Sequence, residues 1–349
     1  MSELRINNIT DRAGSSGPII AGVSTVTSTS HMVMPSGPTE MRGGRGRGVV
    51  AGGAQASPVG NVNTMEFIEI ATTGNSTDFG DFNQSVYFGG TGFASATRGL
   101  FAGGYNPNVG ITDIGFFTFS SSGGAQDFGD MAFRRYYPYS PSDSTRGLIS
   151  GGKTNPTNVN LNSIEFVTIA STGDSSEFGD MTDKKNWGAA VNSPTRGLFG
   201  GGRPLHDSNS TYTDAIDFVT IQTRGDALDF GNLVAAAGAM DGCSSTTRGL
   251  WGAKYIGSYT AAIDFVTMAT FGNASDFGDL TRTVFGAGGM SNSIRGVWAG
   301  GQNPSNDPGM NVMDFVTIAT TGNASDFGDL TAARGYVKGC ADSHGGLGD

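Results

Sequence analysis

The sequence repeats one unit of about 50 residues six times, and this repetition constrains the fold more than any other feature. Each copy contains the tripeptide Asp/Glu-Phe-Gly and an Arg-Gly pair followed by two apolar residues. The tripeptides centre on Phe79, Phe128, Phe178, Phe230, Phe277 and Phe327, and the pairs begin at Arg47, Arg98, Arg146, Arg196, Arg248 and Arg295. Such a period predicts an array of equivalent units rather than unrelated domains.

Each copy has the composition of short β-strands joined by turns. In the sixth copy, residues 295–301 form an apolar run that ends in Gly-Gly, and residues 313–320 alternate in polarity with β-branched residues between. Thr321-Gly322-Asn323 is typical of a turn, and residues 325–330 and 333–340 predict two more strands. No segment combines helical length with an apolar helical face, so we predict an all-β protein.

The spacing between the strands separates a constant part of the repeat from a variable part. The Phe of the long strand precedes the Phe of the tripeptide by 12 residues in all six copies, as from Phe67 to Phe79. Length varies only between the Gly pair and the long strand. We therefore expect one adaptable face, formed by residues 54–63, 105–112, 153–162, 203–214, 254–261 and 302–311.

This order of strands and glycines resembles the kelch repeat, which is also about 50 residues long and forms four strands. The resemblance rests on an Arg-containing strand, an apolar strand ending in Gly-Gly and a second apolar strand, here Arg334, Ala102-Gly103-Gly104 and Ile216-Asp217-Phe218-Val219. It implies a six-bladed, kelch-like β-propeller over residues 41–349. Because the chain enters at a second strand and leaves after a first strand, we expect residues 332–342 to complete the first blade.

Composition argues against several classes of partner. The formal net charge is −10, which argues against nucleic acid and anionic membrane surfaces as main partners. No run approaches 18 apolar residues, so no membrane span is predicted. Cys243 and Cys340 are expected to be free thiols, because the ring does not make their repeats neighbours.

Little in the sequence indicates catalysis. His31, His206 and His344 are scattered, and no metal-binding or nucleophile motif accompanies them. Six copies of Asp-Phe-Gly indicate a packing element rather than the single unit of a kinase. The repeated arginines are expected to pair with the acids after the tripeptides, Asp81, Asp130, Asp180, Asp279 and Asp329. We predict no enzymatic activity, no catalytic residue, no metal site and no cofactor.

Residues 1–40 lie outside the repeats and are predicted to be an extended attachment segment. Residues 4–10 and 19–23 read as two strands that lack a core of their own. Residues 17–23 and 320–331 resemble repeat-bearing tail-fibre and other virion structural proteins of marine tailed phages. The resemblance implies a virion component assembled in the host cytoplasm, bound to other virion proteins through residues 1–40, with a homo-oligomer as a further expectation.

Two functions follow from this organisation. In the first, the variable loops bind a host-surface glycan through aromatic and polar side chains, which suit that ligand. The candidate residues are Tyr105, Arg203, His206, Tyr212, Tyr255 and Tyr259. In the second, the propeller is an architectural or kelch-type adaptor that binds a protein and has no receptor role.

Overall fold

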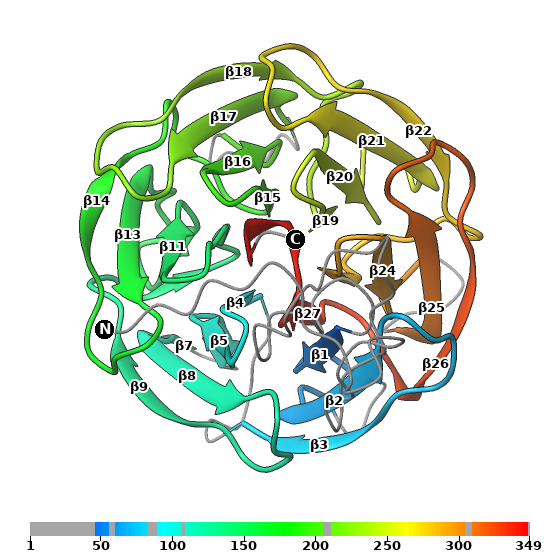
Figure 1. Ribbon diagram of the computed structural model, residues 1–349. Helices are drawn as coiled ribbons and strands as arrows, with labels where there is room; N and C mark the ends of the chain where they lie inside the picture. The colour runs from blue at the N-terminus through cyan, green and yellow to red at the C-terminus, as the bar shows by residue number, and fades with distance from the viewer. Residues whose placement is uncertain are drawn as a thin grey trace, which may run out of the picture. The chain divides into compact units, whose positions relative to one another are not determined.

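The computed structural model describes residues 46–55, 60–82, 89–106, 109–204, 211–303 and 309–347. They form six sheets of three or four antiparallel strands around a central axis, as Figure 1 shows. There is no α-helix in this part of the chain, and one 3-10 turn, η2 (Gly345–Leu347), ends it. The predicted all-β six-bladed propeller is confirmed. The predicted attachment segment, residues 1–40, lies outside the described residues.

Each blade has the same order of strands from the axis outward. The innermost strands are β4 (Thr91–Ala94), β15 (Ala189–Asn192), β19 (Asp241–Ser244), β23 (Gly288–Ser291) and β27 (Lys338–Ala341). The second strands are β1 (Arg47–Ala51), β5 (Arg98–Ala102), β11 (Arg146–Ser150), β16 (Arg196–Gly200), β20 (Arg248–Gly252) and β24 (Arg295–Ala299). The third strands are β2 (Thr64–Glu69), β8 (Asp113–Thr118), β13 (Ser163–Thr168), β17 (Ala215–Thr220), β21 (Ala262–Thr267) and β25 (Met310–Thr317). The outermost strands are β3 (Thr77–Asp81), β9 (Gln126–Asp130), β14 (Ser176–Asp180), β18 (Leu228–Asn232), β22 (Ser275–Asp279) and β26 (Ser325–Arg334).

The last strand of the chain completes the first blade. β27 pairs with β1 in the order β27-β1-β2-β3, with Gly48 opposite Ala341 and Val49 opposite Cys340. The closing strand is shorter than the predicted 332–342, because residues 332–334 still belong to β26. Cys243 and Cys340 are both free and buried, as predicted.

The third blade lacks a regular innermost strand. Its place is taken by residues 138–142, which make only the isolated bridges Tyr139 to Ser150 and Ser142 to Gly147. Pro138 and Pro141 have no N–H to donate, so a continuous ladder cannot form there.

The tripeptide builds a β-bulge between the third and fourth strands. In the first blade, Met65 faces Gly80 but Glu66 faces Asp78, so that Phe79 is the extra residue. Gly80 has φ of 136°, a backbone conformation that favours glycine, and a Cβ there would lie 2.5 Å from the carbonyl oxygen of Gly123 in the next blade. The six bulge phenylalanines, Phe79, Phe128, Phe178, Phe230, Phe277 and Phe327, are all buried.

Main-chain hydrogen bonds join the blades at the periphery. Gly123 donates to Phe79 O at 2.7 Å and Ala125 donates to Asp81 O at 2.8 Å, so the turn of one blade covers the open edge of its neighbour. The same pair of bonds closes the ring, from Gly74 to Phe327 O at 2.8 Å and from Ser76 to Asp329 O at 2.9 Å.

The arginine that opens each second strand also joins two blades. Arg98 stacks on Phe116 of its own blade and donates to Ala170 O of the next at 2.8 Å. Equivalent bonds to carbonyl oxygens are made by Arg47, Arg146, Arg196, Arg248 and Arg295. The predicted pairing with the acids after the tripeptides is wrong. Among the described residues, the one carboxylate that such an arginine contacts is Glu69, paired with Arg47.

A buried ion pair lies beside the third strand of five blades. The acid directly precedes the long-strand Phe. The cation lies at or after the end of the preceding blade's outer strand in four pairs, and Lys254 lies in the loop between β20 and β21. The pairs are Arg334–Glu66, Arg135–Glu165, Lys185–Asp217, Lys254–Asp264 and Arg282–Asp314. The second blade has Gly115 at this position, and residues 83–88 before that blade contain no Lys or Arg. Its joint with the first blade is aromatic instead, with Phe82 and Phe101 ring centroids 5.1 Å apart.

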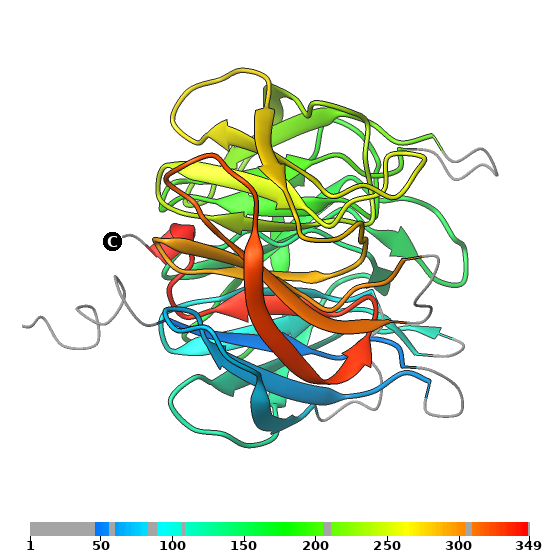
Figure 2. The same cartoon turned by 90° about the vertical axis from the view of Figure 1, so that its right-hand side faces the viewer.

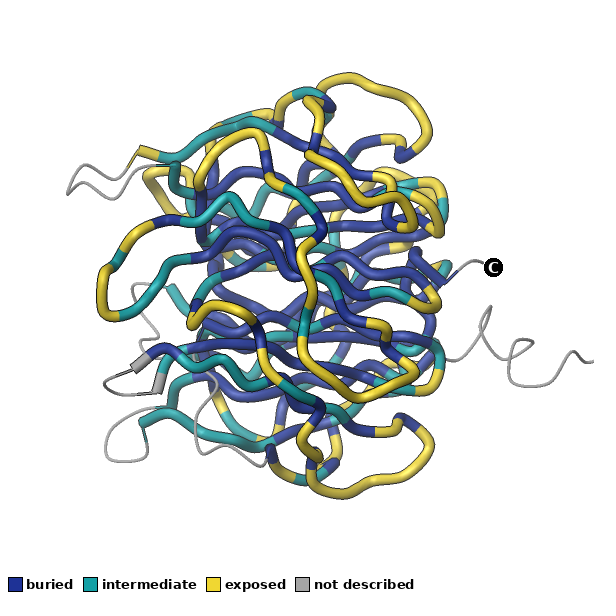
Figure 3. Tube along the Cα trace, turned by 90° about the vertical axis from the view of Figure 1, so that its left-hand side faces the viewer, coloured by how far each residue is buried: buried dark blue, intermediate teal, exposed yellow. Residues whose placement is uncertain are grey.

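The strand order gives the disc two different faces. The connections between second and third strands, together with the crossings to the next blade, form what we call the loop face. The tight turns and η2 form the opposite turn face, where Figure 2 shows the C-terminus. Burial concentrates around the axis and exposed residues lie in turns and at the periphery (Figure 3).

Candidate functional site

Two concentric rings of residues surround the axis on the loop face. The outer ring, which we call the rim, consists of the residue after each Gly pair or its equivalent. Its members are Ala54, Tyr105, Lys153, Arg203, Tyr255 and Gln302. Antiparallel pairing to the crossing segment fixes the backbone of rim residues, as in Tyr136 with Lys153, Asn186 with Arg203 and Gly238 with Tyr255.

The inner ring surrounds the mouth of the central channel. Its members are Gly89, Tyr137, Trp187, Ala239, Gly286 and Tyr336, one from each crossing, and each has φ between 52° and 70°. Their peptides bond head to tail: Trp187 donates to Tyr137 O at 3.1 Å and Ala239 donates to Trp187 O at 2.7 Å. Left-handed backbone is rare for Tyr and Trp and tends to occur where side chains serve a site. We call this group the mouth ring.

Aromatic side chains from both rings form one continuous arc over the loop face. Neighbouring ring centroids along the arc are 5.1 to 6.0 Å apart, and Arg203 stacks on both Trp187 and Tyr212, with Cζ 5.4 and 5.6 Å from their ring centroids. The loop-face arc runs through Tyr105, Tyr136, Tyr137, Trp187, Arg203, Tyr212, Tyr255, Tyr259, Phe285 and Tyr336.

Five of the six residues predicted to contact a ligand belong to this arc. Tyr105, Arg203 and Tyr255 are rim residues, and Tyr212 and Tyr259 contact Tyr255 from the returning loops. The sixth, His206, lies outside the described residues.

The tyrosines of the arc are partly exposed. Tyr105, Tyr136, Tyr137, Tyr212 and Tyr255 are half-buried, and Tyr259 is 38% exposed. Burial raises the pKa of the Tyr136 and Tyr212 phenols, and burial together with neighbouring tyrosines raises the pKa of Tyr137 well above its usual value. The phenols of Tyr136, Tyr137 and Tyr212 are therefore neutral across the physiological range of pH, and the Tyr136 hydroxyl donates to Asn158 Oδ1 at 2.9 Å.

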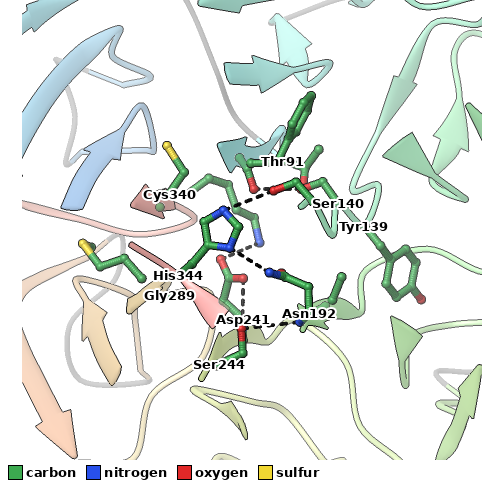
Figure 4. A pocket seen from close by; sticks show the side chains of 18 of the residues that line it. Thr91, Tyr139, Ser140, Asn192, Asp241, Ser244, Gly289, Cys340 and His344 are labelled. Atoms are coloured by element: carbon green, nitrogen blue, oxygen red, sulfur yellow. Dashed lines mark hydrogen bonds and ion pairs between the residues drawn. The ribbon is translucent and has the colours of Figure 1, made fainter. Parts of the chain in front are cut away.

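The channel beneath the mouth ring is nearly filled. Side chains of all six blades surround a cavity of about 50 Å³, with Lys338 paired to Asp241 at 3.3 Å on its wall. On the turn face, His344 closes the channel (Figure 4): its Nε2 lies 2.8 Å from Ala94 O, and its Nδ1 accepts from Asn192 Nδ2 at 2.7 Å. The cavity has room for a few water molecules and not for a sugar or cofactor.

Comparisons with known proteins add no identification, since no protein-family model matches the chain and no curated protein matches its sequence. In the part of the chain that the structure describes, no three His, Cys, Asp or Glu side chains gather as metal ligands. That part also contains no helix of the length and hydropathy that crossing a bilayer requires. The evidence for a site is therefore geometric, and it points to the loop-face arc.

Several residues of the rim and the arc were missed by the sequence analysis. Lys153 occupies the same repeat position as Tyr105 and Arg203, so alignment of the residues after the Gly pairs would have found it. Trp187 and Tyr336 lie in crossings assigned to the constant part of the repeat. Their approach to the axis depends on positive φ, which their residue types do not indicate.

The buried position of His344 predicts an acid-sensitive closure of the channel. Burial lowers its pKa from the usual 6.5 to about 4. The unfolded chain takes up this proton near pH 6.5, whereas the folded protein does so only near pH 4. The contribution of neutral His344 to the free energy of unfolding is therefore fully present above pH 6.5 and is lost as the pH falls towards 4. We expect a loss of about 2 kcal/mol at pH 5, measured as a lower melting temperature than at pH 7.

The variant His344→Gln separates this effect from the other titrating groups. Asp264, Asp314 and Asp342 have raised pKa values through burial and titrate in both proteins. The difference in pH dependence between wild type and variant therefore reports the titration of His344. Between pH 7 and pH 5, the melting temperature of the variant should change much less than that of the wild type. Equal pH dependence in the two proteins would contradict the assignment.

Proposed function

We propose that the protein is a non-enzymatic binding propeller whose loop-face arc recognises carbohydrate. The observation that carries this proposal is the run of aromatic rings from Tyr105 to Tyr336 around the channel mouth, in which Arg203 bridges Trp187 and Tyr212. Sugar rings have apolar faces that stack on aromatic side chains and hydroxyl edges that bond to polar groups. The arc supplies both, because its tyrosines combine an aromatic face with a neutral hydroxyl.

The surroundings of the arc support binding more than catalysis. Ring contacts of Tyr137 with Trp187 and of Tyr336 with Phe285 restrict these side chains before any ligand arrives. Ring contacts among Tyr255, Tyr259 and Phe285 further reduce the freedom of the exposed Tyr259. Preordered side chains lose little conformational entropy on binding, which suits recognition of a flexible, hydrated polymer.

Removal of one exposed ring is the direct test. We expect Tyr259→Ala and Tyr212→Ala each to weaken binding of a glycan ligand roughly tenfold, since each loses a stacking face. Ligands are first found on an array of bacterial-surface oligosaccharides and affinities are then measured by calorimetry.

Phe271→Ala is the matched control, because Phe271 is 59% exposed and lies in a turn on the opposite face. Equal losses in all three variants would indicate a general effect on folding. The absence of any glycan ligand for the wild type would contradict the proposed function and favour the adaptor alternative.

We propose further that this propeller belongs to a virion structural protein, a tail-fibre or appendage component that displays the loop face to the host. The proposal rests on the resemblance of residues 17–23 and 320–331 to virion proteins of tailed phages. Cryo-electron microscopy of particles is the test. We expect six-bladed discs attached through residues 1–40 with the loop face outward, and particles without such discs would contradict it.

A further inference from the structure

The basic residues of the rim lie in one sector. The rim residues of two neighbouring blades are Lys153 and Arg203, and tyrosines stand at the rim positions on either side, Tyr105 and Tyr255. The other two rim residues, Ala54 and Gln302, are uncharged. In a chain of net charge −10, two adjacent cations among aromatic rings form a distinct local surface.

A buried network of asparagine amides connects the backbones of Lys153 and Arg203. Asn160 is paired with Lys153 through an antiparallel bridge and donates its side-chain N–H to Arg203 O at 2.8 Å. Asn186 donates to Asn160 Oδ1 at 2.6 Å and exchanges main-chain bonds with Arg203. Both asparagines are nearly inaccessible, at 4% and 6% exposure. The backbones that carry Lys153 and Arg203 are therefore fixed relative to each other.

Each cation lies against aromatic rings with its charged end on the loop face. Lys153 Nζ is 5.9 Å from the centroid of Tyr136, and Arg203 stacks on Trp187 and Tyr212. Among the described residues, no carboxylate lies within ion-pair distance of Lys153. Burial and the nearby Arg203 both lower the pKa of Lys153, so the two like charges repel each other in the unliganded protein.

We propose that this sector binds an anionic carbohydrate, with Lys153 and Arg203 contacting its acidic group and Tyr212 and Tyr136 contacting the adjoining sugar faces. This inference rests on the proposed function and names its ligand class. An anion between the cations removes their mutual repulsion, and the guanidinium plane is suited to paired hydrogen bonds with a carboxylate or phosphate. The net negative charge of the whole chain makes an extended polyanion a poor alternative.

The test uses matched acidic and neutral ligands. An array carries uronic-acid oligosaccharides, each beside its methyl ester, and phosphorylated oligosaccharides, each beside its uncharged dimethyl ester, together with neutral glycans and single-stranded oligothymidylate. We expect an acidic form to bind about tenfold more tightly than its ester, as for a charge-assisted hydrogen bond, with affinity falling as salt rises. The uronic-acid and phosphorylated series identify which acidic group is recognised.

Variants assign the preference to the rim. Lys153→Gln and Arg203→Gln should remove most of the preference for the acidic form, and Lys153→Arg should retain it. Arg224→Gln, which removes the same charge from an exposed turn on the opposite face, should leave it unchanged. Equal binding of acid and ester, or tighter binding of oligothymidylate, would overturn the inference of an anionic ligand. In either case, binding of neutral glycans would still support the proposed function. No binding of any glycan would overturn both.

Discussion

Deletion of residues 337–349 is expected to destabilise the whole ring rather than one blade. The deletion removes β27, so that β1 loses one of its two neighbours and becomes an open edge facing the axis. Buried apolar side chains are lost with it, namely Val337, Cys340, Ala341 and Leu347. Their burial is worth at least about 5 kcal/mol, so we expect the melting temperature to fall by roughly 8 °C, measured by calorimetry.

Two truncations separate the effect of losing β27 from the effect of losing the 3-10 turn that follows it. A start at Val337 keeps Arg334, whose guanidinium pairs with Glu66 at 2.5 Å and would otherwise be lost too. Deletion of residues 344–349 removes His344 and η2 but leaves β27, and it should cost much less. A peptide of residues 337–347 added to the truncated protein should restore stability. Unchanged melting of the 337–349 deletion would contradict closure through β27.

Removal of one partner from a buried ion pair is expected to cost nearly as much. Lys185 Nζ lies 2.9 Å from Asp217 Oδ2, and both side chains are 1% exposed. The variant Asp217→Val leaves the ammonium group without its counter-ion in a site that water does not reach. We expect a loss of about 3–5 kcal/mol, seen as a fall in melting temperature of roughly 6 °C.

The double variant Lys185→Met, Asp217→Val is the control for this prediction. With both charges gone, no desolvated charge remains, and most of the stability should return. The second blade is a natural precedent, because it has Gly115 in place of the acid and no Lys or Arg in residues 83–88. A double variant as unstable as the single one would show that packing, rather than the unpaired charge, causes the loss.

The fold could be predicted because its determinants are local and repeat. The Asp/Glu-Phe-Gly tripeptide that forms the bulge, the short second strand and the 12-residue spacing recur in every copy. Each copy alone is a weak signal, but six copies together predict one common pattern of strands. The exact start of the closing strand could not be predicted, because β26 runs on to Arg334 where the other outer strands stop earlier. That difference arises from the pairing of Met310 with Arg334, which lies outside the repeat pattern.

The site could be predicted only where the sequence varies. Tyr105, Arg203 and Tyr255 stood out because they are aromatic or charged residues in the loops of variable length. The roles of the repeated arginines could not be foreseen, since their acceptors are carbonyl oxygens that every residue possesses. By contrast, the acid before five of the six long-strand phenylalanines, as in Asp217-Phe218 and Asp314-Phe315, is a polar residue in an apolar strand and was a usable signal of buried pairing.

Closure through β27 also determines how the ring responds to mechanical load. β1 begins beside Asp342 on the turn face and is bonded along its length to β27 on one side and β2 on the other. A pull on the chain at Gly46, directed away from the disc, runs parallel to β1 and loads both ladders in shear, with all their hydrogen bonds sharing the force. A propeller tethered at this point can therefore resist drag on its loop face without opening blade by blade.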